Sequence, residues 1–249
     1  MWRWADAAPR SPGRPPIWSS PTTSWPPSWP PPKKVAGVYA NIRRFLLYGL
    51  SGGTAEILVM LAGPLVGLAL PLLPAQILWV NLLTHGLPGV ALGSEPVDPK
   101  VMARPPRPPA ESVLGAGLWQ RILRVGAAIA AVTLAIAVWA HATDRPWQTM
   151  AFFALGATQL AVALGSRARP GSRANPMLLV AVAGALALQF AGVYLPPLQH
   201  LLGTEPLTLL DLLVVCAAAT VGYAAVRLDR VVHPTKPPLQ AATPAGRES

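Results

Sequence analysis

Long runs of apolar residues, separated by short polar or proline-rich stretches, dominate the chain after residue 40. A helix needs about 20 mostly apolar residues to cross the hydrocarbon core of a bilayer, and strands of that length are rare. Six runs of about this length occur, at residues 45–69, 75–93, 121–141, 148–165, 177–196 and 207–226. The pattern therefore predicts an all-α, polytopic membrane bundle with six transmembrane helices.

The second run contains residues that interrupt a regular helix, because it reads His85-Gly86-Leu87-Pro88-Gly89. Proline lacks the backbone N–H, and glycine is the poorest helix former after proline. Broken helices are tolerated in a membrane where they line a cavity or contact protein. We therefore predict that the second transmembrane helix is broken at Gly86-Pro88.

Composition agrees with a membrane protein and excludes a soluble enzyme. Hydrophobic residues make up 52% of the 249 residues and charged residues only 12%, against roughly 25% charged residues in soluble domains. The single cysteine excludes an internal disulfide framework. Residues 1–37 are rich in Pro, Trp and Ser without periodicity, so we predict a disordered segment there and a disordered tail at 233–249. Residues 38–232 form the predicted membrane domain.

The net charge of +10 is distributed unevenly along the chain. Apart from Arg145, every Lys and Arg falls in the N-terminal tail, in residues 96–124, in residues 167–173 or in the C-terminal tail. Six spans place these regions on one side of the membrane. This positive-inside pattern predicts a multi-pass protein of the cell (inner) membrane with both termini cytoplasmic. The expected partner is the lipid bilayer and not nucleic acid, because no aromatic-interleaved basic motif accompanies the charge.

Glu56 is a carboxylate within the first apolar run, and no Lys or Arg lies within four residues of it. Ionisable side chains inside a membrane are costly and commonly mark ion or proton pathways. The structural alternative is a neutral glutamic acid that is hydrogen-bonded between helices. Glycines at positions 49, 52 and 53 would let a neighbouring helix approach closely.

Asn81, Thr84 and His85 follow in the second run at i, i+3 and i+4, so they share one helical face. The break that follows them would free backbone carbonyls. Alone, this polar face could serve interhelical hydrogen bonding. Together with Glu56 on the preceding helix, it favours a site for a hard cation or a proton.

Several segments resemble the membrane domain of type-II P-type ATPases, the class that includes calcium pumps. NIRRFLLYGLSGGTAEILVM, residues 41–60, is similar to their fifth span. Residues 70–112 resemble the sixth span and the loop after it, with the signature D-P-x-x-M-x-R-P-P-R from Asp98 to Arg107. Three further segments resemble the eighth, ninth and tenth spans, at residues 149–164, 175–196 and 203–215. Residues 38 to about 232 therefore resemble the fifth to tenth spans of such a pump.

The resemblance implies cation-binding roles. Glu56 matches the fifth-span carboxylate ligand, Asn81 and Thr84 match sixth-span ligands, and Gln159 matches an eighth-span position that is Glu in calcium pumps of the endoplasmic reticulum. His85 stands where those pumps have an Asp that bridges the bound ions, and Gly53 stands where they have Asn. The cation-binding candidates are Glu56, Asn81, Thr84, His85 and Gln159, and the first four are candidate metal ligands. Because one carboxylate is replaced by an imidazole, the transported cation stays open between protons, monovalent cations and transition metals, and we do not assign a calcium site.

The catalytic half of such a pump has no counterpart in this sequence. It contains no D-K-T-G-T phosphorylation motif, no nucleotide-binding domain, no glycine-rich phosphate loop and no fourth span. We therefore expect no catalytic residue and no cofactor bound by this chain alone, with ATP and Mg²⁺ belonging to the complete pump. The expected function is the membrane portion of a cation pump, a truncated or frameshifted fragment unable to hydrolyse ATP or pump alone. The alternatives are a split pump whose partner is a separate cytoplasmic ATPase half, and an independent passive ion pathway or interaction protein.

A second hypothesis for residues 1–37 is out-of-frame translation. Codons permitted for residues 10–36, read from the third base of each codon, can encode a segment similar to the one that precedes the fifth span in the family. That segment would continue directly into Val38. The nucleotide sequence tests this hypothesis.

Overall fold

The computed structural model describes residues 32–96, 112–167 and 175–233, and within these ranges the fold is entirely helical. Five helices are long and apolar enough to cross a membrane: α1 (Pro32–Ala62), α4 (Leu118–Ala142), α5 (Trp147–Gly165), α6 (Pro176–Tyr194) and α8 (Leu209–Val232). The shorter elements are the 3-10 helix η1 (Pro64–Val66), α2 (Pro74–His85), α3 (Leu87–Gly93) and α7 (Pro196–Leu202). The prediction of an all-α membrane bundle is confirmed.

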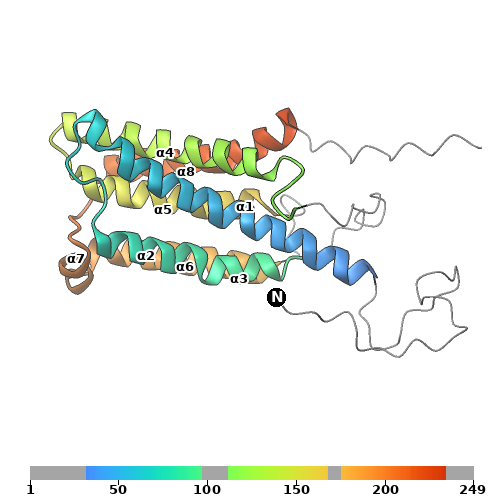
Figure 1. The fold of residues 1–249 in the computed structure, drawn as a ribbon. Coiled ribbons are helices and arrows are strands. Elements are labelled where there is room, and N and C mark those ends of the chain that lie inside the picture. Colours follow the sequence, from blue (N-terminus) through green and yellow to red (C-terminus); the bar gives the residue numbers. More distant parts are fainter. Residues whose placement is uncertain (1–31, 97–111, 168–174, 234–249) are drawn as a thin grey trace, which may run out of the picture.

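The second predicted span consists of two helices, α2 and α3, separated at Gly86. Gly86 has φ −68° and ψ −102°, outside the helical region. A Cβ atom at this position would lie 2.5 Å from the carbonyl oxygen of Leu82, so only glycine fits. Neither α2 nor α3 is long enough to span alone, but together they run along the bundle beside α6 (Figure 1). The predicted break is therefore present, and Gly86 is the residue at which it occurs.

The helices form two layers with α5 between them. In Figure 1, α4 and α8 lie in the upper layer, α2, α3 and α6 lie in the lower layer, and α1 crosses both obliquely. α5 contacts α1, α2, α3, α4, α6 and α8, and nearly all of its residues are buried. Its glycines permit this packing, since a Cβ at Gly165 would lie 2.3 Å from Cγ1 of Val226.

Two predicted boundaries are wrong. Residues 32–37, assigned to the disordered N-terminal segment, are the first residues of α1. Proline is favoured at the first position of a helix, so Pro32 starts α1 upstream of the apolar run. The first run also ends earlier than residue 69, because Gly63 and Pro64 terminate α1 and begin η1. The rest of the predicted N-terminal segment, and the tail after His233, lie outside the described residues.

Candidate functional site

Glu56 lies on α1 and is nearly buried, with 8% of its surface exposed. Its two carboxylate oxygens accept hydrogen bonds from two different helices. Nδ2 of Asn81 on α2 donates to Oε2 over 2.9 Å, and Nε2 of Gln159 on α5 donates to Oε1 over 3.1 Å. These three side chains, the Glu56 cluster, join α1, α2 and α5 inside the bundle.

The Glu56 carboxylate lacks a cationic partner in the described part of the chain. Across the three described ranges, no Lys, Arg or His side chain forms a salt bridge with this carboxylate. Two neutral amides donate to it, and a buried ionised carboxylate requires more compensation than that. An ionised Glu56 is therefore left with a charge that an external cation could balance.

Gln159 supplies a second feature expected of a cation site. Its side chain is buried, and among the described residues its Oε1 atom has no hydrogen-bond partner. This oxygen faces Gly52 on α1, where a Cβ atom would lie only 2.8 Å away. Buried polar atoms are nearly always hydrogen-bonded, so an unpartnered amide oxygen beside a carboxylate fits a hard-cation ligand.

The Glu56 cluster presents oxygen atoms from one carboxylate and two amides. Within the part of the chain that the structure describes, no group of three or more His, Cys, Asp or Glu could hold a metal ion. The cluster offers one carboxylate and the amides of Asn81 and Gln159. It suits an ion that prefers oxygen to nitrogen or sulfur, and it supplies a single negative charge.

Thr84 and His85 form a different group, nearer the start of α1. The Thr84 hydroxyl donates to the carbonyl of Val80 over 2.9 Å and lies 3.3 Å from Nδ1 of His85. Nε2 of His85 lies 3.0 Å from the carbonyl oxygen of Gly49. Because a carbonyl only accepts, this contact requires a hydrogen on Nε2.

This second group is separate from the Glu56 cluster. Gly49 precedes Glu56 by seven residues, or about 10 Å along α1. No hydrogen bond links Thr84 or His85 to Glu56 within the described residues. The structure therefore brings together Glu56, Asn81 and Gln159, and it places the other two predicted site residues against Gly49 and Tyr48.

Tyr48 is a residue of this region that the sequence did not indicate. Its ring is buried, and its hydroxyl donates to the carbonyl oxygen of Thr84 over 2.6 Å. In a continuous helix, Thr84 would bond to the N–H of residue 88, but Pro88 has none. The carbonyl freed by the break is thus taken by Tyr48. A tyrosine at this position has no local signal, because its partner lies on another helix.

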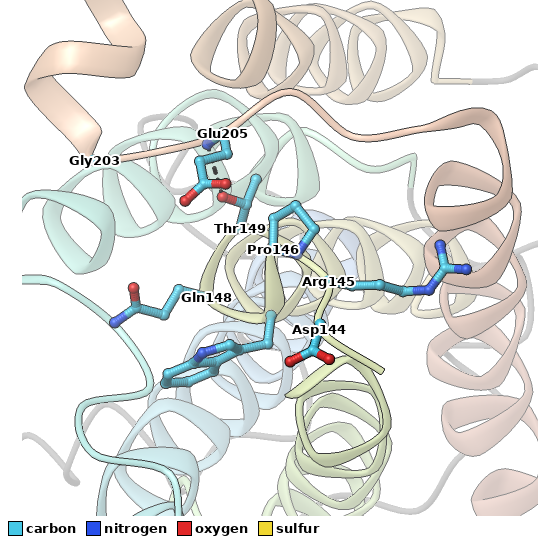
Figure 2. Close-up of a pocket in the computed structure, with 8 residues that line it drawn as sticks. Asp144, Arg145, Pro146, Gln148, Thr149, Gly203 and Glu205 are labelled. Carbon is cyan, nitrogen blue, oxygen red and sulfur yellow. Dashed lines mark hydrogen bonds between the residues drawn. The ribbon is translucent and has the colours of Figure 1, made fainter. Parts of the chain in front are cut away.

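A cavity of about 240 Å³ lies near one end of the bundle, around the connection between α4 and α5 (Figure 2). Asp144, Gln148 and Glu205 are among its lining residues. The backbone N–H of Glu205 donates to Oγ1 of Thr149 over 2.9 Å. No predicted site residue lines this cavity, so the cavity and the Glu56 cluster are distinct features.

Known proteins resemble this chain over most of its length. Residues 69–232 match the family described as cation transporting ATPase, C-terminus. A calcium-transporting ATPase of Bacillus subtilis is 39% identical over 186 residues, which are 71% of this chain and 21% of that protein. Calcium-transporting ATPase type 2C member 2 of Mus musculus is 36% identical over 195 residues, which are 74% of this chain and 21% of that protein. The chain spans about a fifth of the length of these relatives.

Proposed function

Because the chain belongs to the family of cation-transporting ATPase C-terminal membrane domains, we propose that Glu56, Asn81 and Gln159 bind the transported cation. The observation that carries the proposal is the buried Glu56 carboxylate, bonded by two amides and by no cationic side chain in the described ranges. The unpartnered Oε1 of Gln159 supports it. The bundle then acts as the membrane portion of a P-type cation pump.

The ion is less defined than the names of the relatives suggest. Those relatives are calcium-transporting ATPases, but the Glu56 cluster supplies one negative charge. Ca²⁺ sites usually draw six to eight oxygens and more than one carboxylate. We therefore propose half of a cation site, completed by oxygen ligands from outside this chain.

The apolar surface beside the Glu56 cluster supports this proposal. Ile57 and Leu61 on α1 and Leu78 and Leu82 on α2 are each more than 60% exposed. These side chains flank Glu56 and Asn81 along the chain. We propose that further membrane helices cover this face, carried by a polypeptide that also holds the phosphorylation and nucleotide-binding domains. On this proposal the chain neither hydrolyses ATP nor pumps by itself.

We also propose that the termini lie in the cytoplasm. Support comes from the arginines at the start of α4 and the end of α8, because positive charge is retained on that side. Cys216, the single cysteine, is replaced by serine, and one cysteine is introduced at Ser249 or at Glu205. A membrane-impermeant thiol reagent added to intact cells should label position 205 and not position 249. The reverse pattern would overturn the orientation.

Cation binding by the full chain in lipid nanodiscs tests the site. Equilibrium dialysis with Ca²⁺ and with Mn²⁺ should detect weak binding that Glu56→Gln reduces by roughly tenfold or more, since the cluster loses its only charge. Glu205→Gln removes an exposed carboxylate at the cavity and should leave binding unchanged. Equal binding by the parent chain and Glu56→Gln would overturn the proposal.

Co-purification separates the alternatives for the whole protein. If a split pump exists, the affinity-tagged chain should recover a polypeptide that carries a D-K-T-G-T motif from native membranes. If the chain is an independent passive pathway, liposomes that contain only this chain should conduct cations, and Glu56→Gln should reduce the flux. A fragment of a longer pump gives neither result.

A further inference from the structure

Five arginines gather where α4 begins and α8 ends, beside the first half of α1. The start of α4 and the end of α8 lie at the same end of the molecule (Figure 1), and α4 packs against both α1 and α8. The arginine cluster consists of Arg44 on α1, Arg121 and Arg124 on α4, and Arg227 and Arg230 on α8.

One buried carboxylate serves the α4 side of the cluster. Asp229 lies 2.6 Å from Nε of Arg124 and 2.8 Å from Nε of Arg121. Arg121 also donates to the carbonyl oxygen of Val226 over 3.0 Å. Asp229 therefore joins α8 to α4, and both of its oxygens are engaged by these two guanidinium groups.

Counted over the described residues, the α8 side of the cluster carries more positive than negative charge. Arg230 donates to the carbonyl oxygen of Arg167 over 3.4 Å, and the arginines that act on it electrostatically are Arg44, Arg121 and Arg227. Among the residues that the structure describes, Arg227 has no hydrogen bond and no carboxylate partner. Both side chains are half-buried, which weakens screening by water. An anion at this position would relieve the repulsion.

The position of the cluster indicates the kind of anion. The apolar part of α8 ends at Val226, directly before Arg227, and that of α4 begins at Val125, directly after Arg124. The guanidinium groups therefore lie where the hydrocarbon core meets the headgroups. Leu228 and Val231, which alternate with the α8 arginines, are 60% and 77% exposed.

A phospholipid fits this position, because its phosphate matches the guanidinium groups and its acyl chains would run along the apolar part of α8 that ends at Val226. We propose that Arg227 and Arg230, with Arg44 and Arg121 beside them, bind the headgroup phosphate of an anionic phospholipid. A soluble acidic protein segment would match the charge but not its position at the edge of the hydrocarbon core. This site does not depend on the proposed cation site.

Native mass spectrometry of the full, delipidated chain tests the proposal. The chain is titrated with phosphatidylglycerol and with phosphatidylcholine of the same acyl chains. The parent chain should retain phosphatidylglycerol preferentially. Arg227→Gln/Arg230→Gln should bind it about tenfold more weakly, because each arginine near an anionic headgroup contributes to the attraction. Arg227→Lys/Arg230→Lys keeps the charge and should retain most of the affinity.

The matched control removes one guanidinium that the chain already engages. Arg43 donates to the carbonyl oxygens of Val113 and Gly115, so Arg43→Gln, compared with the single Arg227→Gln, should leave phosphatidylglycerol binding nearly unchanged. Circular dichroism checks that each variant is helical, and the single Arg227→Gln replaces the double variant if the latter does not fold. Equal retention of both lipids by the parent chain, or an equal loss in the control, would overturn the proposal. Displacement of the lipid by millimolar inorganic phosphate would also overturn it.

Discussion

Asp211 and Glu56 are both buried carboxylates in membrane helices, with 1% and 8% of their surfaces exposed, yet their surroundings differ. Asp211 accepts bonds from the backbone N–H and the hydroxyl of Thr208, and it forms a 2.6 Å ion pair with Arg145. Glu56 accepts bonds from two neutral amides. Among the described residues, the protein thus supplies a cationic partner for Asp211 and none for Glu56.

The comparison separates a carboxylate whose partners are structural from the one that we propose as a cation ligand. Asp211 caps the first turn of α8. Its ion pair with Arg145 also holds the connection between α4 and α5 against this turn, and Arg145 lies 5.2 Å from the ring of Trp139. Every partner of Asp211 is fixed within the chain. Loss of Asp211 contacts should therefore reduce stability, whereas changes around Glu56 should chiefly alter cation binding.

The largest effect is expected for Arg145→Met. It leaves Asp211 buried without a counter-ion, which typically costs about 3–5 kcal/mol. Unfolding of the purified chain by denaturant in mixed micelles measures the change. The double variant Arg145→Met/Asp211→Asn should recover much of the loss, since it removes the unpaired charge. A change below about 1 kcal/mol in Arg145→Met would contradict the structural role of this pair.

Gly52→Ala should give the next largest effect. Its Cβ would lie 2.8 Å from Oε1 of Gln159, so the amide must move, at a cost of about 1–3 kcal/mol. Cation affinity should fall in the same variant, because Gln159 leaves Glu56. Gly53→Ala is the matched control, since nothing lies within 4 Å of its Cβ and alanine favours the helix. Equal effects of the two substitutions would argue against close packing at Gly52.

Tyr48→Phe should cost about 1 kcal/mol, because the carbonyl of Thr84 loses its hydrogen bond inside the bundle. Cation binding by the Glu56 cluster should be unaffected, because Tyr48 belongs to the separate group near Gly49. Thermal unfolding with and without added Ca²⁺ measures both quantities. A large loss of cation binding in Tyr48→Phe would show that the two groups act as one site.

The smallest change in stability is expected for Glu56→Gln, and its sign is opposite to that of the others. Without a cation, removal of an uncompensated buried charge should leave stability unchanged or raise it by up to about 1 kcal/mol. Stabilisation by added Ca²⁺ or Mn²⁺ should disappear in this variant. A clear destabilisation without cation would instead assign Glu56 a structural role like that of Asp211.

The sequence predicted the helices because their signal is local. Long apolar runs mark the spans, and Gly86 with Pro88 marks the break, because both residues act on their own backbone. The extension of α1 to Pro32 and the short helix α7 lacked an apolar run and were not predicted. Gly63 and Pro64 are local signals for the end of α1. Because apolar residues follow them, the predicted run was extended past this point.

The candidate site was less predictable, because its contacts join residues far apart in the chain. Helical spacing places Asn81, Thr84 and His85 on one face of α2. One turn along α2 separates Asn81 from the other two residues, and this is enough to give them different partners on α1. Gln159 came from family resemblance, since no local feature links α5 to α1. Tyr48 was missed because the carbonyl that it binds becomes available only through Pro88 on another helix.

The central position of α5 has a consequence for biogenesis. Its most apolar stretch has the lowest mean hydropathy among those of the five long helices, and it contains Gln159 and several Thr and Gly residues. Transfer of such a segment from the translocon into lipid should be less favourable than transfer of the other four long helices. Its neighbour α4 is more apolar and is joined to it by a short connection, so the two can enter the bilayer together as a hairpin. In the finished bundle, packing against α6 and α8 shields α5 from lipid.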